Sequence, residues 1–202
     1  MPVKSLLYPV GGSRDSLYRP SLIGRSEMRK ILVVVDMQKD FVDGALGTKE
    51  AAAIVPAVVD KIREYDKENI FVTRDTHQKD YLTTQEGRKL PVEHCIEGTP
   101  GWELDTAVAA AVEGAAIVNK PTFGSTELMD IIRGISKTEE ISIELIGLCT
   151  DICVVSNALL LKAAMPEVEI SVDASCCAGV TPEKHEAALD TMRSCQIQVI
   201  GA

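Results

Sequence analysis

Reactive side chains follow four of the apolar, β-branched runs in this sequence. Asp36 comes directly after the first run, Asp75 and His77 after the second, Lys120 after the third and Cys153 shortly after the fourth. Ligands of open α/β sheets bind beyond the carboxyl ends of the strands, so these residues are expected to meet at one edge of a sheet. A carboxylate, an imidazole, an ammonium and a thiol at one edge indicate an active site.

Cys153 is the candidate nucleophile of this group. Thr150 and Asp151 are good helix caps, so Cys153 is expected in the first turn of a helix, where the helix dipole lowers the pKa of a thiol. Asp36 is the candidate base for the thiol proton, and Lys120 would keep Asp36 ionised. Simpler roles stay open: Cys153 as a small buried hydrophobe, Asp36 as a cap or turn residue, and Lys120 as a solvated charge.

A second group of ligand-type side chains lies in the long connection over residues 74–101. It contains Asp75, His77, Glu86 and His94, and so two of the three histidines of the chain. Connections of this length are uncommon unless they have a function. Two imidazoles and two carboxylates suit Zn, Mn or Fe, with water completing the coordination. The alternative is a solvated loop, because acidic residues are common in loops.

The elements that must position these residues alternate between strand and helix. Apolar, β-branched runs predict strands at 30–35, 69–73, 115–119, 141–147, 168–172 and 196–200. Helical spacing of apolar residues predicts helices at 48–66, 102–112, 125–134, 152–164 and 182–194. This order predicts an α/β fold, a doubly wound, mainly parallel six-stranded sheet with helices on both faces. The third histidine, His185, is expected on the exposed side of the last helix.

Length and composition exclude several classes of protein. The 202 residues are 46% hydrophobic and 25% charged, which fits one domain with a real core and excludes a disordered or collagen-like chain. The net charge of −9 has the wrong sign for a partner such as nucleic acid or an anionic membrane. Six cysteines without a signal peptide indicate a reducing cytoplasm rather than a disulfide framework.

Residues 1–27 differ from the rest of the chain. They are rich in Ser, Gly and Pro and show no periodicity, so they are expected to form a flexible N-terminal extension. Residues 28–202 are expected to form a single domain, because no internal repeat or change in composition divides them.

From residue 28 onward the sequence resembles the isochorismatase-like cysteine hydrolases, and within them the nicotinamidases. The resemblance covers about 170 residues, in the same order, and rests on VVVDMQKDF (33–41), TRDTH (73–77), HCIEGTPG (94–101), NK (119–120) and GLCTDICV (147–154). The last of these segments is highly specific.

The resemblance implies a catalytic triad of Asp36, Lys120 and Cys153. It also implies a non-proline cis peptide bond between Leu148 and Cys149. The backbone N–H groups of Cys149 and Cys153 would then bind the oxyanion of the reaction.

The same resemblance implies a divalent metal held by Asp75, His77 and His94. Glu86 matches the place of a further carboxylate ligand that some nicotinamidases supply from this loop. Zinc is the expected metal, with Mn or Fe as alternatives, and no organic cofactor is expected.

The substrate pocket departs from the nicotinamidase pattern at two positions. Phe41 matches a residue that packs on the substrate ring. A Trp is often found three residues before the last metal histidine, where this chain has Pro91. The aromatic residue often found about seven positions past the lysine is Glu127 here, and Phe123 is the candidate replacement.

Taken together, the resemblance implies a metal-dependent amidohydrolase that deamidates nicotinamide to nicotinate and ammonia through a cysteine thioester, in NAD salvage. The expected partners are a small-molecule amide and further copies of the chain in a homo-oligomer. One alternative is a related cysteine hydrolase that cleaves a C–N bond in another small amide, a ureido or a carbamoyl compound. A third possibility is a catalytically silent homologue that binds a small molecule.

Overall fold

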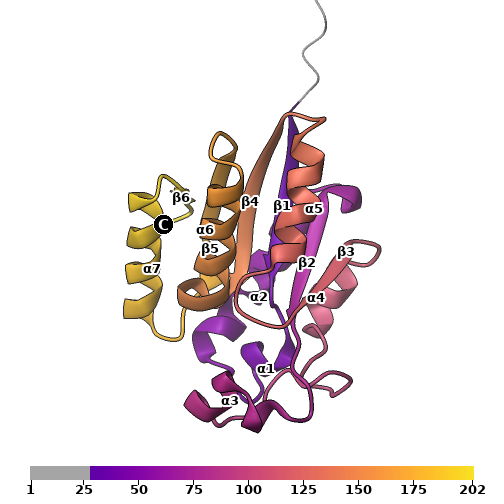
Figure 1. Cartoon of the computed structure of the whole chain (residues 1–202), viewed down its shortest axis with the longest axis vertical. Coiled ribbons are helices and arrows are strands. Elements are labelled where there is room, and N and C mark those ends of the chain that lie inside the picture. Colours follow the sequence, from indigo (N-terminus) through magenta and orange to yellow (C-terminus); the bar gives the residue numbers. More distant parts are fainter. Residues whose placement is uncertain (1–27) are drawn as a thin grey trace, which may run out of the picture.

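The computed structural model describes residues 28–202, and they form a three-layer α/β fold. The sheet has six strands, all parallel, in the order β3-β2-β1-β4-β5-β6 (Figure 1). The strands are β1 Arg29–Val35, β2 Ile70–Asp75, β3 Ala116–Lys120, β4 Ile141–Leu148, β5 Glu169–Ala178 and β6 Gln198–Ile200. The predicted fold class is confirmed. The extension at 1–27 lies outside the described residues, and its boundary with a single domain stays a prediction.

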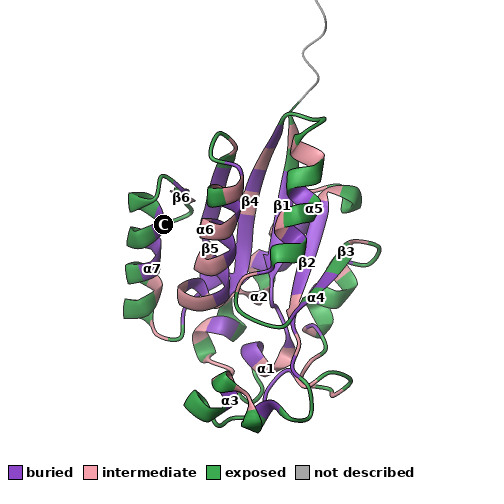
Figure 2. Ribbon diagram, viewed as in Figure 1, coloured by how far each residue is buried: buried purple, intermediate pink, exposed green. Residues whose placement is uncertain are grey.

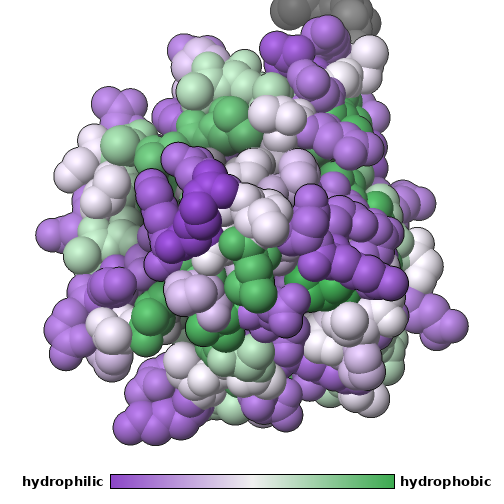
Figure 3. Space-filling model, turned by 60° about the horizontal axis from the view of Figure 1, so that its bottom comes forward, coloured by the Kyte–Doolittle hydropathy of each residue, from purple (hydrophilic) through white to green (hydrophobic). Residues whose placement is uncertain are grey.

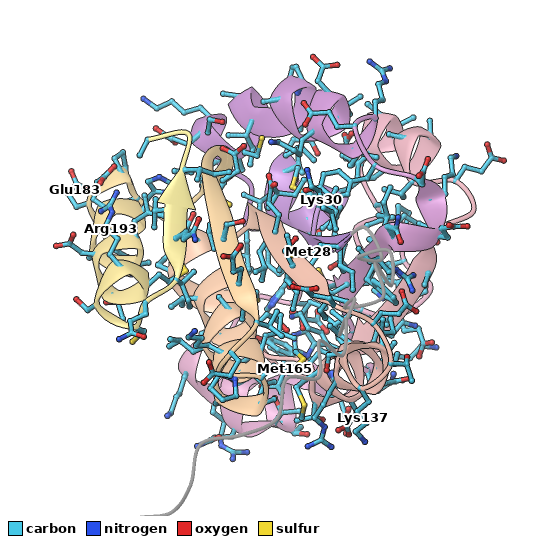
Figure 4. The ribbon with its side chains drawn as sticks, turned by 90° about the horizontal axis from the view of Figure 1, so that it is seen from above. Met28, Lys30, Lys137, Met165, Glu183 and Arg193 are labelled. Carbon is cyan, nitrogen blue, oxygen red and sulfur yellow. The ribbon has the colours of Figure 1, made fainter. Side chains whose placement is uncertain are left out.

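Helices cover both faces of this sheet. The helices of residues 28–202 are α1 Lys39–Val42, α2 Lys49–Ile62, α3 Gln85–Lys89, α4 Thr106–Ala111, α5 Thr126–Ser136, α6 Val155–Ala164 and α7 Pro182–Ser194. Buried residues of α5, α6 and α7 pack on one face, and those of α2 and α4 pack on the other. Seen along the sheet from the amino ends of its strands, near Met28 and Lys30, the helices lie in layers on both sides (Figure 4). No helix among residues 28–202 combines the length and the apolar character needed to cross a membrane.

The central position of β1 in the sheet explains why the sequence of this strand is continuously apolar. Ile31, Val33 and Val35 face the layer of α5, α6 and α7, whereas Leu32 and Val34 face the layer of α2 and α4. All five side chains are fully buried, and the interior of the sheet is buried along most of its length (Figure 2). A strand buried on both faces needs apolar residues at every position.

Three of the predicted helices begin at side-chain caps. Thr48 accepts a hydrogen bond from the backbone N–H of Ala51, Ser125 caps α5 in the same way, and Thr181 caps α7 directly before Pro182. Such caps satisfy backbone donors that the first helical turn leaves free.

The helix predicted at 102–112 is shorter in the structure, where α4 begins at Thr106. The side chain of Asp105 accepts hydrogen bonds from the backbone N–H groups of Ala107 and Val108, which fixes the start of the helix. The residues before it pair with the chain that follows β1, since Lys39 N–H donates to the carbonyl of Glu103. They therefore support the turn after Asp36 instead of extending the helix.

The strand predicted at 168–172 is longer in the structure, because β5 continues past the charged residue Asp173. Asp173 lies 3.1 Å from the ammonium of Lys61 and accepts hydrogen bonds from the backbone and hydroxyl of Ser175. A paired and hydrogen-bonded carboxylate can be buried within a sheet. The strand therefore continues to Ala178 and reaches the edge where the reactive residues gather.

Gly147 lets the central strands approach each other closely beside that edge. Its φ of 115° is unfavourable for other residues, and a Cβ there would lie 2.1 Å from the carbonyl oxygen of Val35. The pairing of β4 with β5 also shifts between Leu145 and Gly147.

We predict that Gly147→Ala lowers the free energy of unfolding by about 3 kcal/mol or more, because strain and a backbone clash combine. Gly134→Ala is the matched control, since Gly134 lies in α5 with open space around it. The control is expected to gain about 0.4–1 kcal/mol. Urea denaturation measures both, and equal effects of the two substitutions would contradict the role of Gly147.

Candidate active site

Asp36, Lys120 and Cys153 meet at the carboxyl edge of the sheet, and all three are buried. The Lys120 Nζ atom lies 2.6 Å from Asp36 Oδ2 and 3.4 Å from Cys153 Sγ. Asp36 directly follows β1 and has a φ of 47°, whereas Lys120 is the last residue of β3. The structure therefore brings together the three residues that the sequence predicts as a triad.

The electrostatics of the triad are governed by burial. Burial raises the pKa of Asp36, and the facing ammonium of Lys120 opposes this shift. Burial disfavours the charged form of Lys120 as well, but Asp36, Cys153 and Asp75 more than compensate and raise its pKa. A close Lys–Asp ion pair thus lies beside the sulfur atom.

The pKa of the Cys153 thiol differs from the prediction that a helix dipole lowers it. Burial, followed by the negative charge of Asp36, raises the pKa of Cys153 well above its usual value. A thiol with a raised pKa would need a base before it could act as a nucleophile, and Asp36, whose charge contributes to the shift, is the candidate for that base.

The turn that carries Cys153 is not the first α-helical turn that the sequence predicts. Residues Thr150–Val154 form a single π-helical turn, η3, which leads into α6. The Leu148–Cys149 peptide bond before it is cis, as the resemblance implies.

Thr150 and Asp151 do not cap this turn, which corrects the prediction. The Oγ1 atom of Thr150 lies 2.8 Å from Nδ1 of His185, and Asp151 accepts a hydrogen bond from the backbone N–H of Val180. His185 was expected on the exposed side of α7, but it is half-buried against the turn that carries Cys153. Residues of α7 and of the segment just before it thus hold the π-helical turn η3 in place.

Four side chains of the long connection gather beside the triad. Asp75, His77, Glu86 and His94 each offer one ligand atom, and these atoms all lie within 4.8 Å of one another. Nε2 of His77 lies 3.0 Å from Asp75 Oδ2 and 3.7 Å from Glu86 Oε1. Nε2 of His94 lies 3.7 Å from Asp75 Oδ2 and 3.8 Å from Glu86 Oε1.

This donor set fits a divalent cation. Among residues 28–202, the buried Nε2 atom of His77 has no hydrogen-bond partner, although Asp75 Oδ2 lies 3.0 Å away. Nδ1 of His94 is 2.8 Å from the carbonyl oxygen of Val92, which leaves Nε2 free to face the other three residues. Metal-bound histidines typically use the second ring nitrogen in this way.

The triad and the ligand cluster share Asp75. Its Oδ1 atom lies 3.5 Å from Lys120 Nζ, whereas its Oδ2 atom faces the two histidines. Although burial opposes it, the contacts with His77 and Lys120 lower the pKa of Asp75. One carboxylate thus belongs to both halves of a single site.

The two predicted pocket residues differ in their surroundings. Phe41 is buried, with its ring centroid 5.5 Å from that of His94, so it lies beside the cluster. Phe123 is 42% exposed, and its role in the pocket stays a prediction. This edge of the molecule shows hydrophobic side chains among hydrophilic ones (Figure 3).

Three buried residues that support the site were missed by the sequence analysis. Thr73 donates to Asp36 Oδ1 at 2.6 Å, and Gln38 makes two hydrogen bonds with the backbone of Asp75. Asn157 donates to the backbone carbonyls of Cys153 and Phe123. Gln38 and Thr73 lie within segments that carry the resemblance, but no pattern in the sequence indicates these particular contacts.

The geometry agrees with the comparisons with known proteins. The profile of the isochorismatase domain matches residues 30–202. The chain belongs to the isochorismatase family. No curated protein sequence matches it.

Solved structures of this family resemble the chain over most of its length. A pyrazinamidase of Pyrococcus horikoshii in complex with zinc is 29% identical, with a TM-score of 0.70 over 86% of this chain and 99% of that one. A pyrazinamidase/nicotinamidase from Streptococcus mutans is 27% identical, with a TM-score of 0.74 over 85% and 99%. A nicotinamidase from Bacillus subtilis is 26% identical, with a TM-score of 0.69 over 86% and 99%. These relationships support a hydrolase of the amidohydrolase type.

A zinc titration tests the ligand cluster. Glu86→Gln should weaken zinc binding about tenfold, or by about 1.4 kcal/mol, because the amide oxygen carries no charge. Glu93→Gln is the matched control, since Glu93 is exposed and adjacent to His94. Competition with a coloured chelator gives the affinities. Wild-type affinity in Glu86→Gln would remove Glu86 from the ligand set.

Proposed function

We propose that this member of the isochorismatase family hydrolyses nicotinamide to nicotinate and ammonia, with Cys153 as nucleophile and a divalent metal in the site. The reaction would serve NAD salvage. Support comes from the buried triad, from the four-ligand cluster beside it, and from related structures described as nicotinamidases.

The observation that carries this proposal is the shared carboxylate of Asp75. Through Oδ1 it contacts the lysine of the triad, and through Oδ2 it faces the histidines of the cluster. A substrate held at the cluster would therefore lie next to the thiol. Such positioning replaces a bimolecular encounter by a step within one complex.

The first half of the reaction begins with the proton of the thiol. Asp36 accepts it, and the sulfur of Cys153 forms a bond to the carbonyl carbon of the amide. The backbone N–H groups of Cys149 and Cys153 are the proposed donors to the oxygen that becomes negative. A donor of this kind contributes about 3–4 kcal/mol to stabilising the transition state.

The second half releases ammonia and restores the thiol. Asp36 returns the proton to the amide nitrogen, the C–N bond breaks, and a thioester on Cys153 remains. A water molecule, losing its proton to Asp36, attacks the thioester carbon and releases the carboxylic acid, and the sulfur is protonated again. Lys120 keeps Asp36 ionised between these transfers.

The metal would be held by Asp75, His77, Glu86 and His94. When bound, it would supply a positive centre that binds the ring nitrogen of the substrate. Phe41 packs beside His94 and would cover one side of the ring. We propose zinc, since the Pyrococcus relative is described with zinc, while Mn and Fe suit the same donors.

We also propose a cytoplasmic location and a homo-oligomer for the enzyme. All six cysteines are free thiols, which supports a reducing, cytoplasmic location. A homo-oligomer, and the lack of nucleic-acid and membrane partners, remain our predictions.

An ammonia-release assay tests the reaction. The zinc-loaded protein should release ammonia from nicotinamide, and Cys153→Ala should reduce the rate to background because no thioester can form. Cys195→Ala is the control, since Cys195 is exposed at the end of α7. Unchanged turnover in Cys153→Ala would overturn the mechanism.

The same assay separates the alternatives. Release of ammonia from ureido or carbamoyl compounds but not from nicotinamide would favour the related C–N hydrolase. No turnover of any amide by folded, zinc-loaded protein would favour the catalytically silent homologue.

The pH dependence of kcat/KM tests the role of Asp36. Thr73 donates a hydrogen bond to the carboxylate and so lowers the pKa of Asp36, which burial raises. Asp36 must be ionised to accept the proton, so activity is lost as the pH falls through its pKa. Thr73→Val raises that pKa, and the acid limb should move up by about 0.4–1 pH unit.

Thr83→Val is the control for this profile, because Thr83 is exposed and its hydroxyl donates to the carbonyl of Asp80, away from Asp36 in the chain. A Thr73→Val profile that coincides with wild type would show that another group controls the acid limb.

A further inference from the structure

Tyr81 lies against both histidines of the ligand cluster. It is fully buried in the short 3₁₀ turn η2 (Tyr81–Thr83), between His77 and Glu86 in the chain. Its ring centroid is 4.6 Å from that of His77 and 5.0 Å from that of His94, at interplanar angles of 52° and 78°. One aromatic ring thus contacts two imidazoles that are themselves 4.8 Å apart.

The hydroxyl of Tyr81 is directed elsewhere. It donates a hydrogen bond of 2.9 Å to the carbonyl oxygen of Leu90, which lies between Glu86 and His94 in the chain. The phenol proton is therefore used in a hydrogen bond to the backbone. This hydrogen bond holds the backbone segment that leads to His94.

The backbone of Tyr81 fixes the segment that carries Glu86. The hydroxyl of Thr84 donates to the Tyr81 carbonyl at 2.7 Å, and the same side chain caps α3 by accepting from Gly87 N–H. A Cβ at Gly87 would lie 2.0 Å from the Tyr81 carbonyl oxygen, so α3 packs directly on this residue. Glu86 lies in the first turn of α3.

We infer that Tyr81 is a positioning residue of the metal site, and that it sets the spacing of His77, Glu86 and His94 before the ion binds. This inference rests on the proposed function, because it assumes that the cluster binds a metal. The ring packs against both imidazoles and so orients them, while the hydroxyl and the carbonyl hold the two ends of the segment that contains Glu86. Without these contacts, the connection must be ordered when the ion binds, at the cost of affinity.

Tyr81→Phe tests the hydroxyl and keeps the ring. Zinc affinity, measured by chelator competition, should fall about threefold to tenfold, which is the value of one lost hydrogen bond. Tyr81→Leu removes the ring as well, and should weaken zinc binding further and change the visible absorption spectrum of the Co(II)-substituted protein. Tyr81→Phe should keep the wild-type Co(II) spectrum, because its ring still orients both histidines.

Leu82→Ala is the matched control, since Leu82 is the next residue of the same turn and is 47% exposed. It should bind zinc as wild type does. A folded Tyr81→Phe protein with wild-type zinc affinity would overturn the inference, whether or not Tyr81→Leu folds. A wild-type protein that binds no zinc would instead contradict the metal site of the proposed function.

Discussion

The buried ammonium of Lys120 is the interaction on which the carboxyl edge of the sheet depends. It lies 2.6 Å from Asp36, 3.4 Å from the sulfur of Cys153 and 3.5 Å from Asp75. Burying a charge costs several kcal/mol, and only close partners of opposite charge offset that cost. Removing Asp36 would leave the ammonium with only the more distant carboxylate of Asp75. The ends of the strands that supply these groups must therefore lie at matching levels of the sheet.

The register of the sheet satisfies this requirement. Asp75 and Lys120 are paired positions of the parallel strands β2 and β3, so both end at the same level. Val35 pairs with Gly147 of β4, which places Asp36 beside the turn that carries Cys153. Because Gly147 has no side chain, β1 and β4 approach closely at this level. A one-residue slip between neighbouring strands would turn these side chains to the opposite face of the sheet.

Much of this arrangement could be predicted from local sequence, and most of what was missed depends on partners far along the chain. Continuous apolar runs locate the strands, and the residues that follow them locate the triad. Thr73, Gln38 and Asn157 escaped prediction because they have partners far along the chain: Asp36 is 37 residues from Thr73, Asp75 is 37 residues from Gln38, and Phe123 is 34 residues from Asn157. Thr150 and Asp151 look like caps, yet they bond to residues 35 and 29 positions away. Local patterns carry no information on such distant partners.

The thiol shows how a local expectation can be reversed by the fold. The partial positive charge at the start of a helix favours the thiolate form of a cysteine. This effect predicts a lowered pKa for Cys153. Complete burial next to a carboxylate acts in the opposite sense and dominates, so the pKa is raised. A neutral buried thiol reacts poorly with oxidants and with adventitious electrophiles, because the thiolate is the reactive form. In the proposed enzyme, the sulfur would thus become reactive only as Asp36 accepts its proton, and the Lys120–Asp36 pair makes the carboxylate available for that transfer.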